Sequence, residues 1–246
     1  MSGVDADLLI VPVFEEDLSS DAARFDAATR GESARAVASK EFQAKLYDLF
    51  FTPIVDAAWH TRRVLFIGAG PGAACGGEII RRLATAAGLA ARQKRAERVA
   101  FVLRGRGEAA ELAQAVAEGL TLAEFNGGTY KTSEPEPAPS PSWTILVEGS
   151  GDVPAAVSAA VARGRVLGDC SNLARDLANE PGNTLTPTEF ATRAAAVVAD
   201  TGVRVDILDE TQIAELGMGL LLGVARGSSE PPRLVVFRHE IGRAHV

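Results

Sequence analysis

Residues 63–103 read RVLFIGAGPGAACGGEIIRRLATAAGLAARQKRAERVAFVL, and this stretch decides the fold. Its first part, Arg63–Gly68, is a short apolar run that ends in glycine and predicts a buried strand. Ala73–Ala87 follows with apolar residues at helical spacing, and Arg98–Leu103 is a second apolar run. A strand, a helix and another strand in this order predict parallel strands with helices packed on the sheet.

The same alternation continues on both sides of this stretch. Leu8–Phe14 predicts another buried strand, and Ala34–Leu49 has its apolar residues at helical spacing. Further on, Glu108–Leu122 predicts an amphipathic helix and Trp143–Val147 a strand. The proline-rich segment Gly127–Ser142 between them predicts an exposed loop, because alternating prolines form neither helix nor ladder. We therefore predict an α/β fold with a mainly parallel sheet for a first domain at residues 1–150.

A second series of elements begins after residue 150. Pro154–Ala178 has a long helical pattern, with an apolar face that includes Val166, Leu167, Cys170, Leu173, Ala174 and Leu177. A helix is expected to begin at Thr186, because Thr186, Pro187 and Glu189 fit a capping box with proline at the first helical position. Val203–Leu208 and Leu234–Phe237 predict strands, with a short helix at residues 209–216 between them. We expect residues 151–240 to be the linking helix and the start of a second, incomplete α/β domain.

Composition and charge narrow the functional classes. The net charge of -7 argues against nucleic acid as a partner, because an acidic surface repels phosphate. The basic run Arg92–Arg98 is the local exception, and we interpret it as a solvated helix end. Cys75 and Cys170 are far apart in sequence and have no metal-type spacing. Two such cysteines do not indicate a disulfide framework, and this favours a reducing, cytoplasmic location. The N-terminal apolar run is too short to predict a signal peptide or a membrane span.

The segment Gly68–Ala73 reads GAGPGA and fits G-x-G-x-x-A, a dinucleotide-binding pattern placed between a strand and a helix. Such turns hold a pyrophosphate on the amides of a helix N-terminus. Arg104 follows the next strand, where an acidic residue would select NAD and an arginine favours NADP. An NADP-binding module is therefore the alternative function, although Pro71 is a poor fit to the tight turn.

Other candidate side chains do not form a site in sequence. The histidines His60, His239 and His245 have no zinc-type spacing, and Ser228 and Ser229 lie in a predicted turn without G-x-S-x-G. Four aspartates are candidate metal ligands by residue type, but we expect them on solvated faces and in ion pairs: Asp169, Asp176, Asp206 and Asp209. We therefore predict no catalytic, cofactor-binding or metal-binding residue in this chain.

Two segments carry a family resemblance. Residues 172–191 read NLARDLANEPGNTLTPTEFA, and residues 216–232 read LGMGLLLGVARGSSEPP. Both are similar to segments that open the catalytic domain of the leucyl aminopeptidase (cytosol aminopeptidase) family. Residues 1–150 resemble the family's N-terminal domain more loosely, through Glu41, Phe42, Lys45 and the RVLFIGAG strand. In that family the N-terminal domain is an α/β domain of macro-domain-like topology.

The resemblance implies a two-metal aminopeptidase that releases N-terminal amino acids from peptides and assembles as a homohexamer. Two divalent cations, zinc or manganese, would activate a bridging water there. The family's ligands, a lysine, several aspartates and a glutamate, lie in motifs such as N-T-D-A-E-G-R, which this sequence does not contain. We therefore expect this chain to be a fragment that binds no metal and is inactive alone.

Residues 241–246 read IGRAHV and do not resemble the family. The same six residues are the translation of a common sequencing-adapter string, ATCGGAAGAGCACACGTC. We therefore expect residues 241–246 to be a non-native tail.

Overall fold

The structure is a computed structural model that describes residues 1–132, 139–147 and 152–240. The chain forms two compact units, Met1–Ala174 and Arg175–Val246, and each is described here by itself. The predicted proline-rich loop falls partly, and the predicted non-native tail entirely, outside the described residues. The helix that begins after residue 154 continues across the limit between the two units.

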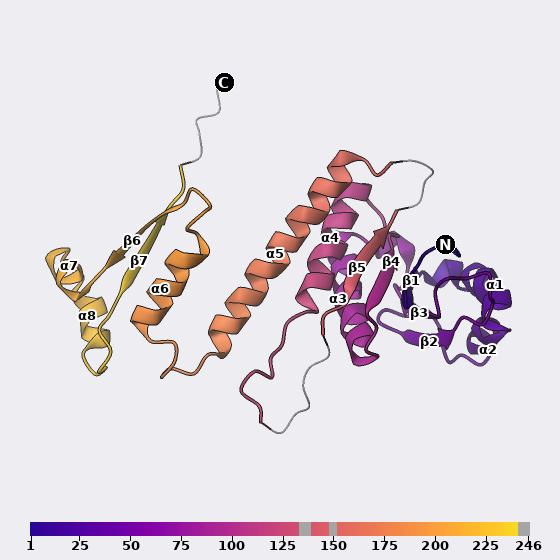
Figure 1. Cartoon of the computed structure of the whole chain (residues 1–246), viewed down its shortest axis with the longest axis horizontal. Coiled ribbons are helices and arrows are strands. Elements are labelled where there is room, and N and C mark those ends of the chain that lie inside the picture. Colours follow the sequence, from indigo (N-terminus) through magenta and orange to yellow (C-terminus); the bar gives the residue numbers. More distant parts are fainter. Residues whose placement is uncertain (133–138, 148–151, 241–246) are drawn as a thin grey trace. The chain divides into compact units, whose positions relative to one another are not determined.

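The first unit is built on a five-stranded sheet in the order β2-β3-β1-β4-β5. Its parallel strands are β1 (Leu8–Val13), β3 (Arg63–Gly68), β4 (Arg98–Val102) and β5 (Ser142–Leu146). β2 (Leu49–Pro53) pairs antiparallel with β3 at one edge. The prediction of a mainly parallel α/β sheet is confirmed (Figure 1).

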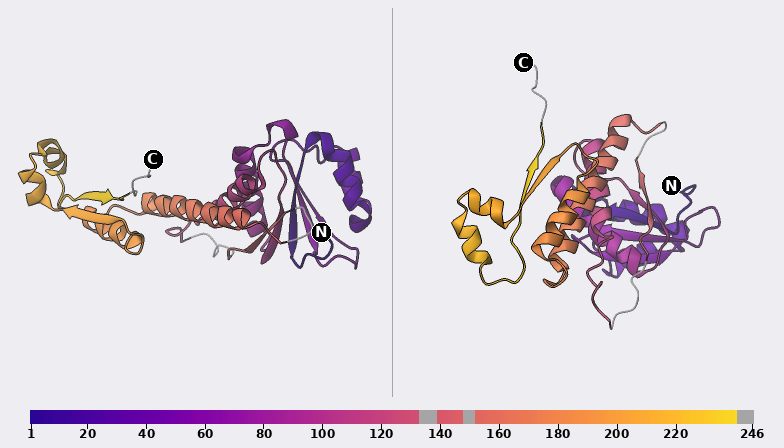
Figure 2. Two further views of the ribbon diagram at one scale, coloured as in Figure 1. Left: turned by 90° about the horizontal axis from the view of Figure 1, so that it is seen from above. Right: turned by 60° about the vertical axis from the view of Figure 1, so that its left-hand side comes forward.

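Helices cover both faces of this sheet (Figure 2). On one face, α1 (Leu18–Thr29) and α2 (Glu32–Ala38) enclose a core that contains Phe25, Phe42 and Phe66. On the other face, α3 (Gly77–Gln93), α4 (Ala109–Leu122) and the start of α5 (Ala155–Asn179) enclose a core of aliphatic side chains such as Leu83 and Leu120. Alternate residues of the buried strands serve the two cores, because successive side chains of a strand point to opposite faces.

Glycines let α3, α4 and α5 approach one another closely. A Cβ atom at Gly119 of α4 would lie 2.2 Å from the Arg81 carbonyl oxygen of α3. On the other side of α4, a Cβ atom at Gly164 of α5 would lie 2.2 Å from the Gln114 carbonyl oxygen. Gly164 and Gly168 are accordingly buried, whereas Val166, on the apolar face identified from sequence, is 60% exposed. The fit of α5 to α4 thus depends on small residues.

The sequence reading of residues 34–49 as one helix is wrong. α2 ends at Ala38, and the chain then forms an irregular loop that leads into β2. Lys40, Ala44 and Tyr47 have positive φ in this loop, so a continuous helix is impossible there. The sequence reading also missed α1 and the 3₁₀ turn at Glu15–Asp17.

The second unit contains α6 (Pro187–Val197), β6 (Arg204–Leu208), α7 (Glu210–Glu215), α8 (Gly219–Ala225) and β7 (Leu234–Arg238). β6 and β7 pair antiparallel, α6 packs on β7, and α7 lies against β6 and α8. α6 begins as predicted, since the Thr186 side chain accepts a hydrogen bond from the Glu189 amide at 3.3 Å. Among the described residues of this unit, only Ala191 and Ile213 are buried.

Candidate functional site

The amides of the glycine-rich turn after β3 are hydrogen-bonded to other segments of the chain. Four of its amides donate hydrogen bonds to oxygen atoms of neighbouring segments, at 2.8 to 3.0 Å: Gly68 N to Asp48 O, Ala69 N to Val13 O, Gly70 N to Ala44 O, and Gly72 N to a Glu16 carboxylate oxygen. A dinucleotide pyrophosphate would need such amides to be free. The Glu16 carboxylate therefore occupies a position that an anionic ligand would take.

The loop that supplies these acceptors lies directly against β3. A Cβ atom at Gly68 would lie 2.0 Å from the Lys45 carbonyl oxygen, so glycine is required for this close approach. Ala44 and Tyr47 adopt left-handed backbone conformations and bring the loop onto the turn. After the turn, a 3₁₀ segment at Gly72–Ala74 separates it from the first residue of α3. The turn is thus a closed structural junction.

Arg104, the candidate for an NADP 2′-phosphate, is held inside the first unit. Its guanidinium donates to Pro12 O at 2.9 Å and pairs with Asp21 at 2.5 Å and Asp17 at 2.9 Å. It also lies over the Phe14 ring, 5.0 Å from the ring centroid. With its donors engaged by two carboxylates and a carbonyl, Arg104 ties the ends of β1 and β4 to α1. The geometry gives no support to the NADP alternative.

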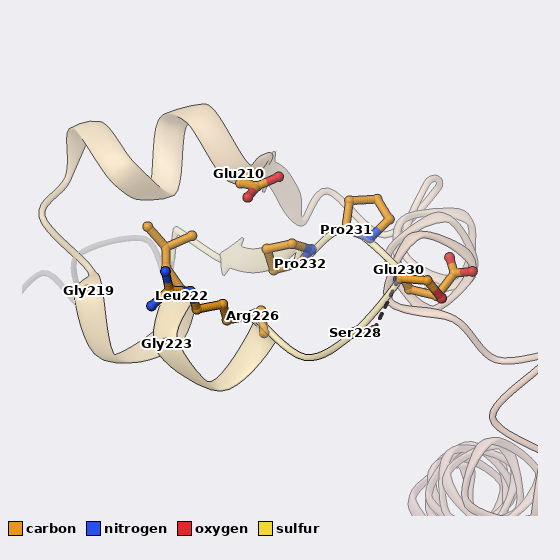
Figure 3. Close-up of a pocket in the computed structure, with 11 residues that line it drawn as sticks. Glu210, Gly219, Leu222, Gly223, Arg226, Ser228, Glu230, Pro231 and Pro232 are labelled. Atoms are coloured by element: carbon orange, nitrogen blue, oxygen red, sulfur yellow. Dashed lines mark hydrogen bonds between the residues drawn. The ribbon is translucent and has the colours of Figure 1, made fainter.

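A hollow of about 550 Å³ lies in the second unit, between α7, α8 and the segment before β7 (Figure 3). Its lining includes the charged side chains Glu210, Arg226 and Glu230, together with Ser228 and Pro231. The Ser228 hydroxyl accepts a hydrogen bond from the Glu230 amide at 3.0 Å, in the turn expected from the sequence. No cysteine or histidine lines this hollow, so its serine hydroxyls have no imidazole base beside them.

The four candidate aspartates are not gathered into one site. Asp206 pairs with Arg238 across the β6–β7 ladder at 3.1 Å, and Asp209 caps α7 in a capping box with Gln212. Asp169 lies 3.9 Å from Arg165 along α5, and Asp176 is exposed on the same helix. In the part of the chain that the structure describes, no group of three or more His, Cys, Asp or Glu side chains is placed to hold a metal.

The remaining polar candidates are isolated from one another. His60 and His239 are exposed and belong to different units, and His245 lies outside the described residues. Cys75 is fully buried, and burial raises the pKa of its thiol to about 11. A thiol with this pKa stays protonated at neutral pH and is a poor nucleophile. Cys170 is exposed on α5.

The basic run at residues 92–98 is used for internal contacts. Arg92 donates to the carbonyl oxygens of Ala123 and Phe125, which ties the end of α3 to the end of α4. Lys94 lies 5.6 Å from the centroid of the Phe51 ring, and Arg98 pairs with Asp5 and Asp7. The run begins in the last turn of α3, and its residues Lys94, Arg95 and Arg98 are exposed, in keeping with the solvated helix end expected from the sequence. None of the described helices is long and apolar enough to cross a membrane.

Comparison with known proteins identifies the family. The model of the cytosol aminopeptidase family, N-terminal domain, matches residues 10–134, and that of the catalytic domain matches residues 172–245. The chain belongs to the cytosol aminopeptidase family. The predicted family resemblance is confirmed in both parts of the sequence.

Relatives and solved structures agree with this membership. A probable cytosol aminopeptidase of Solibacter usitatus is 38% identical over 96% of this chain and 46% of its own length. A tomato leucine aminopeptidase mutant has a TM-score of 0.80 and 25% identity, over 95% of this chain and 48% of that structure. The bottromycin maturation enzyme BotP in complex with Mn has a TM-score of 0.73 and 27% identity, over 96% and 46%. The chain thus spans about half the length of the relatives it matches.

The residues that close the glycine turn could not be identified from the sequence. Glu16 lies 56 residues before Gly72, and no local pattern marks it as a partner of that amide. Ala44 and Tyr47 give no signal either, because alanine and tyrosine are not typical of left-handed positions. A G-x-G-x-x-A pattern alone therefore cannot distinguish an open anion site from a closed turn.

Proposed function

We propose that this chain provides the N-terminal unit and the first part of the catalytic domain of a metal-dependent aminopeptidase, and that it does not hydrolyse peptides by itself. The observation that carries the proposal is the order of the two family matches, residues 10–134 and then 172–245, in a chain about half as long as its relatives. This family membership supports peptides with a free N-terminus as substrates of the complete protein.

The side chains of the described residues do not fit a pair of catalytic cations. Such a site needs several carboxylates that converge on the metals, and here Asp206 and Asp209 are engaged by Arg238 and by the α7 amides. Asp169 and Asp176 lie on exposed turns of α5. We therefore assign the ligands of the metal ions, whether zinc or manganese, to residues that this chain does not supply. The manganese complex of BotP supports manganese as one candidate metal.

Assembly and location complete the proposal. We expect the complete protein to be a homohexamer, as the family resemblance implies, and to reside in the cytoplasm, in keeping with the relatives' name of cytosol aminopeptidase. Nucleic acid is not an expected partner, because the net charge is -7 and the basic run is engaged within the first unit. Mass photometry of the complete protein would test the assembly.

The activity proposal is tested with the purified 246-residue chain and leucyl-p-nitroanilide in the presence of manganese or zinc. The expected result is no p-nitroaniline release above buffer, while the full-length Solibacter usitatus relative, assayed beside it, releases product and loses activity in EDTA. Circular dichroism of the same sample establishes that the chain is folded. Metal-dependent release by the chain alone would contradict the proposal.

A further inference from the structure

A groove of about 310 Å³ runs between the edge strand β5 and helix α5 in the first unit. Its walls are mainly apolar, formed by Trp143, Ile145 and Val147 on the strand side and by Val157 and Val161 on the helix side. The Trp143 indole N–H donates to Glu124 at 2.7 Å, which fixes the ring in the groove wall. Nothing in the aminopeptidase proposal uses this groove.

Among the described strands, β5 has a neighbour on one side only, and its other side faces the groove. β5 lies at the end of the strand order and pairs with β4 in parallel register, with Val99 opposite Trp143. Ser142 N donates to Glu97 O, and Leu146 O accepts from Leu103 N, so the even-numbered residues face β4. Because a strand alternates its bonding direction from one residue to the next, Trp143 and Ile145 direct their N–H and C=O groups away from the sheet.

The residues with outward-facing backbone groups also line the groove. The side chains of Trp143 and Ile145 pack on the α3–α4–α5 side, whereas Leu146 packs on the opposite core. A strand added to β5 would therefore place every second side chain between β5 and α5. Strand addition at a sheet edge beside a helix gives affinity through backbone hydrogen bonds and specificity through such side-chain positions.

Charge sets the direction of the added strand. Among the described residues, Arg165 is the charged residue that lines the groove, and its guanidinium lies 3.9 Å from the carboxylate of exposed Asp169. α5 packs along α4, with Gly164 against Ala117 and Gly168 against Thr121, and the Trp143 ring lies beside Leu120 of α4. Arg165, which lies between the two α5 glycines, is therefore nearer the Trp143 end of β5. A strand antiparallel to β5 would end there with its carboxylate, whereas a parallel strand would bring its positive amino terminus to the same guanidinium.

We propose that this groove binds the extended C-terminal segment of a partner protein, with alternating apolar side chains, antiparallel to β5 and with its free carboxylate at Arg165. The occupant is thus defined by its chemistry: an unblocked C-terminus, β-branched or other apolar residues at every second position, and no bulky charge among them. The inference rests on the first unit alone and stands independently of the aminopeptidase proposal.

The test uses a fluorescein-labelled hexapeptide that alternates threonine and valine and ends in a free carboxylate. It is titrated with the complete 246-residue chain and followed by fluorescence anisotropy. Saturable binding is expected. Ile145→Pro should weaken it at least tenfold, because proline removes the outward N–H of Ile145 and leaves the bonds of its neighbours to β4. Tryptophan fluorescence and circular dichroism verify that this variant folds.

A second comparison does not depend on the proline variant. Arg165→Glu should weaken binding several-fold, and amidation of the peptide C-terminus should weaken binding to the wild type by a similar factor. The two changes together should cost little more than either one alone. Arg163→Glu is the matched control, because it makes the same charge change on an exposed residue of α5 outside the groove. This control should bind like the wild type.

Three outcomes would overturn the proposal. The first is no saturable binding up to millimolar chain. The second is binding that is indifferent to both Ile145→Pro and Arg165→Glu. The third is a concentration-dependent dimer that Ile145→Pro dissociates, as seen by analytical ultracentrifugation, since a second copy would then be the occupant of the edge.

Discussion

The two units use similar local signals but bury their apolar side chains very differently. In the first unit, strands such as β1 are buried at every position, and a hydrophobic core lies on each face of the sheet. In the second unit, Leu220 is 92% and Val224 86% exposed, although α8 is regular and α7 has a full capping box. Capping and turn residues are therefore enough to define where helices and strands begin and end. The stability of a unit depends instead on buried apolar surface, which supplies most of the favourable free energy of folding.

The largest expected difference between the units is in local stability. Backbone amides of β1, β3 and β4 should exchange with solvent only on global unfolding, whereas those of β6 and β7 should exchange orders of magnitude faster, because few apolar contacts support them. Hydrogen exchange followed by mass spectrometry measures this, and limited proteolysis should leave a resistant core. The first domain predicted from the sequence ends near residue 150. The close packing of Gly164 and Gly168 on α4 now places its end within α5. Equal protection of β1 and β7 would remove the contrast.

The next largest effect is expected from a methyl group placed between helices. Gly119→Ala would put a Cβ atom 2.2 Å from the Arg81 carbonyl oxygen, and we expect a loss of about 1–3 kcal/mol or more in the stability of the first unit. Urea unfolding followed by tryptophan fluorescence reports this, since Trp59 and Trp143 both belong to that unit. Gly77→Ala at the start of α3, where the nearest atom would be the Ala115 Cβ at 3.9 Å, is the control in the same unit and should leave the transition nearly unchanged. An unchanged midpoint for Gly119→Ala would show that α3 and α4 are loosely packed.

Charge placed on the exposed residues of α8 should have little effect on stability. The double change Leu220→Lys and Val224→Lys should alter stability by no more than about 0.5 kcal/mol, because side chains so exposed lose little on substitution. It should lower light scattering at high protein concentration, since an apolar patch is removed. The same change at Leu83, which is fully buried in α3, should abolish folding of the first unit. If the α8 variant unfolds the second unit, then α8 is packed in solution.

The smallest effect concerns an ion pair at the start of the first unit. Burial alone would raise the Asp7 pKa, but hydrogen bonds from Arg98 and its charge outweigh burial and lower it below the ordinary 3.8. A carboxyl group with a lowered pKa in the folded state contributes stability above its unfolded pKa and loses it as the pH falls through the folded value. Arg98→Ala should therefore lower the Tm slightly at neutral pH, and the difference from the wild type should shrink as the pH falls below 3.8. Arg24→Ala, an exposed change on α1, is the control; a gap that stays constant with pH would contradict the assignment.

Elements that depend on neighbouring residues could be predicted from the sequence, whereas those that depend on residues far apart in the chain could not. The strands β1, β3, β4 and β5 and the helices α3, α4 and α5 were predicted, because apolar periodicity is a local signal. The loop at residues 39–48 was not, since its left-handed residues Ala44 and Tyr47 are stabilised by hydrogen bonds to Gly68 and Gly70, more than twenty positions away. β2 was missed for the same reason, as its antiparallel place beside β3 follows from that loop.

The functional assignment was predicted from linear motifs and not from any site geometry. The residue pattern at 172–191 is specific to the family, and the catalytic-domain match from residue 172 bears it out. The glycine turn gave the opposite result: its pattern fits nucleotide binding, and only the positions of Glu16, Ala44 and Asp48 reveal that its amides are already bonded.

The closed glycine turn also limits what could be engineered at this edge of the sheet. A phosphate introduced there would first have to displace a carboxylate from Gly72 and lift the 44–48 main chain off β3. Its apparent affinity would be reduced by the fraction of molecules in which that loop is open. Any such design should therefore first stabilise the open conformation of the 44–48 loop. Added phosphate-binding side chains would raise the affinity little as long as the loop stays closed.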